Sequence, residues 1–185
     1  MPPPIPLSFS HVGLFVTDLA RMVDFYTGML GFAVTDRGLL GDTGIAFLSR
    51  DPREHHQLVL VEGRPPGAGA KAVNQVSFRA ASLADLKAFH RLIAAVPGIA
   101  LDPVNHGTAW SLYFPDPEGN RLEVFVDTGW YTPQPYRERL DLALPTDRIR
   151  ADTEALCRGR PGFQPIAVWR ASLAAELGSA AGASD

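Results

Sequence analysis

The 185-residue sequence contains a single cysteine, Cys157, so an internal disulfide bond is excluded. A lone thiol fits a reducing compartment, and we expect a cytoplasmic protein. The first residues, MPPPIPLSF, have neither the cationic region nor the apolar core of a signal peptide. No apolar run reaches the length that spans a membrane, so we expect no membrane partner.

Positive charge is also scarce. The chain has 17 Lys and Arg residues against 20 Asp and Glu residues, and its formal net charge is −3. A nucleic-acid-binding surface needs a basic stripe or block, and none is visible, so we expect no nucleic-acid partner. With 46% hydrophobic and 20% charged residues, the composition is that of a globular protein with one domain, or one domain and an appendage.

A pattern of one strand, one helix and three strands occurs twice, with a period of about sixty residues. The alternating segment Phe9–Thr17 precedes a helix that Asp18 caps, and the alternating segment Val73–Phe78 precedes a helix over Leu83–Ala95 that Ser82 caps. The strands expected after these helices are Phe32–Asp36, Gly44–Leu48 and His56–Val61 in the first copy, and Ile99–Pro103, Trp110–Phe114 and Asn120–Val126 in the second.

The repeat predicts an α+β fold. Two βαβββ modules, at about residues 8–63 and 72–127, are expected to form a cupped mixed β-sheet around a central groove within a domain of residues 1–131. A Gly/Pro-rich bridge at about 62–71 joins them. Residues 132–185 form a C-terminal extension with a helix near 147–157, which we expect to cover an edge of the domain or a partner in a homodimer.

The segment Asn105–Glu123, NHGTAWSLYFPDPEGNRLE, combines chemically active residues with a β-hairpin. Its Asp-Pro-Glu-Gly turn starts at Asp116, where proline sets φ and glycine supplies a positive φ. Glu123 lies among apolar strand residues, where an ionised carboxylate is costly unless a cation meets it. Such a residue, taken alone, is more often a solvent-facing strand position.

The spacing of His106, Tyr113, Asp116-Pro117, Gly119 and Glu123 resembles the signature of the type I extradiol ring-cleavage dioxygenases. That signature runs histidine, short spacer, aliphatic-tyrosine, D-P-x-G, glutamate. The wider resemblance is to the vicinal oxygen chelate superfamily, which includes glyoxalase I, bleomycin-resistance proteins and fosfomycin-resistance enzymes. This superfamily has paired βαβββ modules, so the resemblance agrees with the repeat.

The resemblance implies a metal site. Its three ligands correspond to His11, Gln75 and Glu123, with glutamine where the family has a second histidine. Two neutral donors and one carboxylate form the face that holds Fe(II) and leaves positions open for a catecholate and O₂. We expect Fe(II), with Mn, Zn or Ni as alternatives, because an amide oxygen is a weaker and harder ligand than imidazole.

The resemblance also implies catalytic groups beyond the metal. His56 corresponds to the acid–base residue and is in phase with the apolar residues of its expected strand, so that His55 would point the other way. His106 and Tyr113 would hydrogen-bond to bound oxygen and to the substrate. We expect apolar walls from Phe47, Trp110, Trp130 and Tyr131.

These expectations describe an extradiol-type dioxygenase that cleaves a small catecholic substrate with O₂. One alternative is a glyoxalase-type or epimerase-type isomerase or lyase, which would need a carboxylate where Leu60 stands, although Glu62 shares the face of Leu60. The other is a non-catalytic protein that sequesters a drug, a class that usually lacks the metal ligands.

Overall fold

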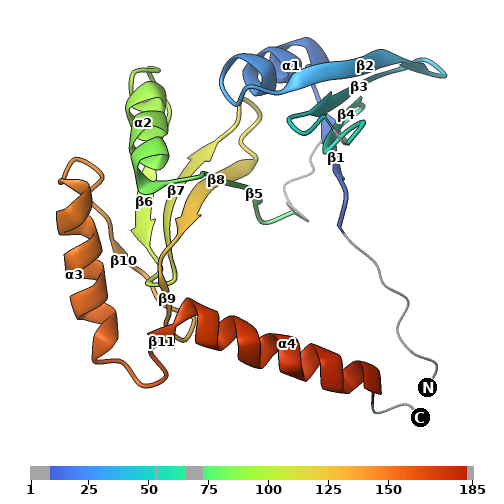
Figure 1. Ribbon diagram of the computed structural model, residues 1–185. Coiled ribbons are helices and arrows are strands. Elements are labelled where there is room, and N and C mark those ends of the chain that lie inside the picture. The colour runs from blue at the N-terminus through green and yellow to red at the C-terminus, as the bar shows by residue number, and fades with distance from the viewer. Residues whose placement is uncertain (1–8, 53, 66–72, 183–185) are drawn as a thin grey trace. The chain divides into compact units, whose positions relative to one another are not determined.

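The computed structural model describes residues 9–52, 54–65 and 73–182, with side chains in the last helix described as far as residue 175. These residues form two compact units. The N-terminal unit comprises residues 9–76 together with 115–121, and the C-terminal unit comprises residues 77–114 together with 122–182. Figure 1 shows the strand–helix–three-strand order in both copies, which confirms the α+β class and the two modules.

The first module consists of β1 (Val12–Val16), α1 (Leu19–Gly28), β2 (Ala33–Leu40), β3 (Thr43–Ser49) and β4 (Leu58–Glu62). Its four strands form one sheet in the order β1-β4-β3-β2. β1 runs parallel to β4, whereas β3 pairs antiparallel with both β2 and β4, so this sheet is mixed as expected.

The second module consists of β5 (Val76–Arg79), α2 (Leu83–Ala94), β6 (Asp102–Asn105), β7 (Ala109–Pro115) and β8 (Arg121–Asp127). Its strands follow the order β5-β8-β7-β6, which is the order of the first module repeated. The strand pairs form a four-stranded and a five-stranded sheet, one for each module.

Both module helices begin where the sequence predicts, because a short polar side chain caps each one. The Asp18 carboxylate accepts a hydrogen bond from the N–H of Arg21 at 3.0 Å. The Ser82 hydroxyl accepts one from the N–H of Asp85 at 3.1 Å. Strand boundaries are less accurate, and β4 begins at Leu58 rather than at His56. Most of the predicted bridge, residues 66–71, lies outside the described residues.

The C-terminal extension consists of β9 (Trp130–Tyr131), β10 (Glu138–Arg139), α3 (Thr146–Arg158), β11 (Gln164–Pro165) and α4 (Ile166–Gly182). β10 pairs antiparallel with β6 and so covers the edge of the second sheet, as expected. The sequence predicts α3 but not α4, whose apolar residues are spread around the helix rather than along one side. Among the described helices, none is both long and apolar enough to cross a membrane.

Side chains on β7 alternate between the two faces of the second sheet. On one face, Trp110 donates its indole N–H to Thr153 of α3 at 2.8 Å, and Phe114 packs against Phe89 of α2 with ring centroids 5.4 Å apart. Tyr113 therefore points to the opposite face. β8 follows the same rule, and its buried apolar side chains are Leu122, Val124 and Val126.

The turn between β7 and β8 forms as predicted. Gly119 has a φ of 76°, and its N–H donates to the carbonyl of Asp116 at 2.9 Å. Glu118, inside this turn, accepts hydrogen bonds from the N–H groups of Thr17 and Asp18 at 2.6 and 2.8 Å, at the start of α1. Its side chain is 8% exposed and lies 3.2 Å from Arg64. Burial alone would raise the pKa of this carboxyl, but the two N–H donors and Arg64 lower it.

We predict that Glu118→Gln lowers the free energy of unfolding at pH 7 by about 1–2 kcal/mol, because charge-assisted hydrogen bonds to the start of α1 weaken. A lowered folded-state pKa stabilises the fold above the unfolded pKa of about 4.3, and this stabilisation is lost as the pH falls through the folded-state pKa. Urea denaturation at pH 7 and near pH 3 checks this. Glu154→Gln, at a side chain that is 39% exposed, should cost less than about 0.5 kcal/mol. An equal loss for Glu118→Gln at both pH values would contradict the assignment.

Candidate active site

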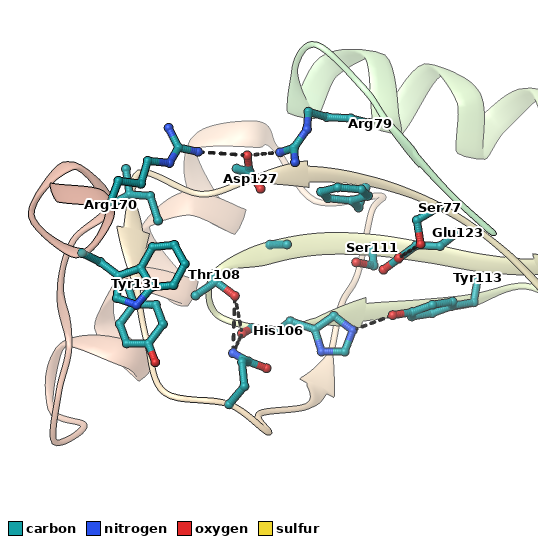
Figure 2. Close-up of a pocket in the computed structure, with 15 residues that line it drawn as sticks. Ser77, Arg79, His106, Thr108, Ser111, Tyr113, Glu123, Asp127, Tyr131 and Arg170 are labelled. Carbon is teal, nitrogen blue, oxygen red and sulfur yellow. Dashed lines mark hydrogen bonds and ion pairs between the residues drawn. The ribbon is translucent and has the colours of Figure 1, made fainter. Parts of the chain in front are cut away.

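A cavity of about 700 Å³ lies within the C-terminal unit, a size that accommodates a small-molecule ligand (Figure 2). It faces the side of the sheet opposite to α2 and α3, and the extension supplies part of its wall. Side chains from β5, β7 and β8 contribute alternate residues, as the strand period requires. The lining residues are Ser77, Arg79, His106, Thr108, Ala109, Ser111, Tyr113, Glu123, Phe125, Asp127, Tyr131, Gln134, Ile166, Trp169 and Arg170.

His106 and Tyr113 form a hydrogen-bonded pair in this cavity. The Nε2 atom of His106 lies 3.0 Å from the Tyr113 hydroxyl, and its Nδ1 atom lies 2.8 Å from the carbonyl oxygen of Tyr136. Because a carbonyl oxygen only accepts, Nδ1 carries the hydrogen, and Nε2 of the neutral ring accepts from the Tyr113 hydroxyl. The structure thus brings together two residues that the sequence predicts to be catalytic.

The extension holds His106 in place. Besides the carbonyl of Tyr136, it provides Gln134, whose amide donates to the backbone carbonyl of His106 at 2.7 Å. The next residue, Gly107, has a φ of 71° and donates its N–H to the Asn105 side chain at 2.9 Å. The orientation of His106 therefore depends on residues about thirty positions further along the chain.

Glu123 points into the cavity and is only 7% exposed, so it is not the solvent-facing residue that an isolated strand glutamate usually is. The Ser77 hydroxyl donates to its Oε2 atom at 2.5 Å. Ser111, fully buried on the neighbouring strand, also lines the cavity, and its hydroxyl has no hydrogen-bond partner among the described residues. Glu123 thus offers a buried carboxylate, and Ser111 offers a buried hydroxyl that has no such partner among the described residues. Both groups suit a site that receives a polar ligand.

The N-terminal unit gathers its own candidate residues around His56. The His56 ring lies 4.3 Å from that of His11 and 5.2 Å from that of Phe47, between centroids. Strand alternation predicts that His55 points away from His56. The structure differs, because both residues precede β4 and do not belong to the strand. Their Nδ1 atoms are 2.9 Å apart, and Nε2 of His55 lies 2.8 Å from the carboxylate of Asp36.

With a neutral His55, this chain of contacts gives one placement of hydrogen on the ring nitrogen atoms. An ionised Asp36 carboxylate only accepts, so Nε2 of His55 donates, and Nδ1 of a neutral His55 then accepts from Nδ1 of His56. In that arrangement the lone pair of His56 is on Nε2. The pKa of His56 is lowered, first because desolvation disfavours the charged ring and then because His11 and His55 are nearby, while Glu54 opposes the effect.

The expected apolar walls divide between two faces. Tyr131 lines the cavity and stacks on Trp169 of α4, with centroids 5.0 Å apart and planes 8° from parallel. Trp110, which is 1% exposed, and Trp130 do not line this cavity. Their rings contact each other at 6.2 Å on the side where Trp110 reaches Thr153 of α3. Strand alternation separates Trp110 from Tyr113, and Trp130 from Tyr131.

The predicted metal ligands belong to different units: His11 and Gln75 to the N-terminal unit, Glu123 to the C-terminal unit. In the part of the chain that the structure describes, no three His, Cys, Asp or Glu side chains cluster as a metal site. The predicted set contains only two residues of those types, together with an amide, so it stays a prediction. Gln75 is partly buried and directly precedes β5.

Three charged residues that the sequence alone did not indicate lie at one end of the cavity. Arg79 of β5 and Arg170 of α4 both form ion pairs with Asp127, the last residue of β8. Arg79 and Asp127 have the same strand parity as Ser77 and Glu123, which is the signal that would have assigned them to this face. No comparable local signal exists for Arg170, because α4 meets the cavity through tertiary packing.

Comparisons with known proteins agree with the fold and the hairpin motif. The family model described as "Glyoxalase/Bleomycin resistance protein/Dioxygenase superfamily" matches residues 8–124. Biphenyl-2,3-diol 1,2-dioxygenase 2 of Rhodococcus globerulus is 28% identical over 123 residues, which cover 64% of this chain and 62% of that protein. Biphenyl-2,3-diol 1,2-dioxygenase 3 of the same organism is 27% identical over 166 residues, covering 86% of this chain and 78% of that protein.

Solved structures support the same architecture. A glyoxylase/bleomycin resistance protein/dioxygenase domain from Frankia sp. EAN1pec is 26% identical, with a TM-score of 0.58, over 67% of this chain and all of that one. The fosfomycin resistance protein FosX from Listeria monocytogenes, in complex with Mn(II) and sulfate, is 17% identical with a TM-score of 0.54. The match covers 67% of this chain and 95% of FosX, and at that identity it indicates the fold alone.

Gly107 lets the chain turn directly after His106, with little space around it. A Cβ atom at this position would lie 3.0 Å from Sγ of Cys157 and 3.1 Å from Tyr136, and it would overlap Thr132. Gly98 also has a positive φ, of 81°, but a Cβ atom there would meet nothing within 4 Å.

We predict that Gly107→Ala lowers the free energy of unfolding by about 3 kcal/mol or more, because it adds overpacking to the cost of a positive φ. The matched variant Gly98→Ala has only the backbone cost, about 1–2 kcal/mol. Chemical denaturation of the two variants measures the difference. Equal losses in the two variants would show that the space beside His106 is not restricted.

Proposed function

Because the chain belongs to the glyoxalase/bleomycin resistance protein/dioxygenase superfamily, we propose that it is a metal-dependent extradiol-type dioxygenase that cleaves a catecholic substrate with O₂. The observation that carries the proposal is that His106, Tyr113 and Glu123 of the signature share one cavity. Two biphenyl-diol dioxygenases among its relatives support the reaction class. The chain spans 62% of the first of these proteins, so its substrate is part of the proposal.

The proposed metal ligands are Glu123, His11 and Gln75. Their chemistry fits a divalent ion, because they offer a buried carboxylate, an imidazole and a neutral amide oxygen. Gln75 lies two residues before Ser77, the donor to Glu123, and side chains two positions apart on an extended chain share a face. Fe(II) is proposed first, with Mn, Zn or Ni as alternatives. When bound, the metal would chelate two vicinal hydroxyls and lower their pKa.

Three side chains of the protein would handle the substrate's protons and orientation. His56 would accept a hydroxyl proton at Nε2, the nitrogen that carries the lone pair when His55 is neutral and donates to Asp36. Tyr113, hydrogen-bonded to His106, would position the oxygen atoms of the reactants in the cavity. Buried Ser111 would offer its hydroxyl to the same ligand.

A direct test is anaerobic reconstitution of the protein with Fe(II), followed by a catechol screen for O₂ uptake and yellow ring-cleavage products. Catechol-dependent O₂ uptake supports the proposal, and omission of Fe(II) should abolish it. Metal binding without O₂ uptake would contradict the proposal and favour an isomerase or lyase. Failure to bind a metal, with retention of aromatic ligands, would favour a sequestering protein.

We predict that Gln75→His increases Fe(II) affinity by roughly tenfold to a hundredfold, because imidazole binds Fe(II) more strongly than an amide oxygen does. Equilibrium dialysis under anaerobic conditions measures this change. Glu123→Gln should have the opposite effect and reduce Fe(II) binding by a similar factor or more. Unchanged affinity in both variants would remove these residues from the proposed ligand set.

We predict that His56→Ala preserves Fe(II) content and lowers turnover by about 10²–10⁴-fold, the usual contribution of a positioned proton-transfer group. His55→Ala should lower turnover by a smaller factor, about tenfold, because it removes the partner that orients His56. The matched control is His90→Ala, on α2 of the C-terminal unit and absent from the cavity lining. Oxygen uptake and metal analysis of all three variants test this order. A His56→Ala variant with full turnover would exclude the acid–base role.

A further inference from the structure

The end of the cavity at the last residue of β8 has an excess of positive charge. The guanidinium groups of Arg79 and Arg170 both contact Oδ2 of Asp127, and Figure 2 shows the two arginines on either side of that carboxylate. Two cations against one anion leave one net positive charge at this end of the cavity. This excess lies apart from Glu123 and His106, which carry the chemistry proposed above.

The two arginines are attached to rigid elements. Arg79 extends from β5, and its guanidinium lies 4.6 Å above the ring of Phe125, a cation–π contact that restrains it. Arg170 extends from the second turn of α4. The residue before it, Trp169, stacks on Tyr131 of β9. Arginine is suited to this position because its planar group forms two parallel hydrogen bonds with a carboxylate or a related oxyanion.

On the cavity face of β8, one apolar side chain, Phe125, lies between the two ends. Glu123, Phe125 and Asp127 follow one another on the same face of β8, which places Glu123 and Asp127 about 13 Å apart at the usual rise per strand residue. Phe125, Ile166 and the stacked pair of Tyr131 and Trp169 line the cavity beside them. A ligand that contacts both ends would therefore have a polar head, an aromatic or aliphatic middle and a second polar group.

We propose that the substrate is a catechol whose ring carries a side chain ending in a carboxylate or a similar oxyanion, and that Arg79 and Arg170 bind this group. The inference rests on the proposed function, because it names the substrate class of the same cavity. The hydroxyls lie at the Glu123 end, the ring contacts Phe125, and the anion meets the two guanidiniums. Asp127 holds the arginines together when the anion is absent.

Isothermal titration of the metal-free protein with 3-(3,4-dihydroxyphenyl)propanoate and with its primary amide tests the subsite. The two probes have nearly the same shape and differ in charge. Both guanidiniums are more than half exposed, with side-chain exposures of 58% and 60%, so we expect the carboxylate to bind roughly tenfold more tightly at low ionic strength. The preference should decrease as salt is added. Equal affinities for acid and amide, or no binding of either, would overturn the proposal.

Variants of opposite sign make the test specific. Arg79→Gln and Arg170→Gln should each reduce the preference for the acid by about threefold or more, whereas Asp127→Asn should increase it, because the net charge of the subsite rises. Arg148→Gln is the matched control: the side chain of Arg148, on α3, is 67% exposed and also pairs with an aspartate, Asp152, away from the cavity. An unchanged preference in both cavity arginine variants would overturn the assignment.

Oxygen uptake by the Fe(II)-loaded protein separates this inference from the proposed function. Cleavage of the acid and the amide at equal kcat/KM would support the dioxygenase and overturn the anion subsite. Tight, arginine-dependent binding of the acid with no O₂ uptake from either probe would support the subsite and contradict the dioxygenase.

Discussion

Strand alternation in the β7–β8 hairpin is the constraint on which the candidate site depends. Trp110, Leu112 and Phe114 are buried on one face of β7, and burial of each large apolar side chain contributes about 1.5–3 kcal/mol. A shift of one residue would expose this set and move Tyr113 into the core. The apolar face therefore determines where the opposite face points, and Tyr113 and Glu123 meet in one cavity.

The C-terminal extension completes what the hairpin begins. Tyr136 and Gln134 hold the ring and the backbone of His106, while Tyr131, Trp169 and Arg170 form one end of the cavity. The superfamily match ends at residue 124, so the residues of the extension that contact His106 or line the cavity all follow it. The chemical groups of the signature thus belong to the part of the chain shared with the superfamily, whereas much of the cavity lining comes from sequence outside that match.

Features that depend on neighbouring residues were predictable from the sequence. The caps at Asp18 and Ser82, the turn at Gly119 and the order of elements in both modules follow from local rules. Features that depend on distant contacts were not. Arg170 reaches the cavity because α4 packs there, and His55 contacts His56 because the chain bends before β4. The expected walls of the cavity include Trp110. Strand alternation alone would have placed its side chain with Leu112 and Phe114, on the face of β7 opposite to Tyr113.

The two charged ends of the cavity are only weakly coupled. At about 13 Å, two unit charges interact by about 0.3 kcal/mol in bulk water and by about 1.3 kcal/mol at the effective dielectric constant of about 20 that suits a pair near a protein surface. Glu123 therefore offsets only part of the positive charge beside Arg79. In the proposed binding mode, each end would select its own chemical group through short contacts, and Phe125 between them would contact the ring. In the same binding mode, a catechol acid bound the other way round would bring its carboxylate to Glu123, where like charges repel, so the proposed contacts favour the orientation that brings the hydroxyls to the residues of the signature.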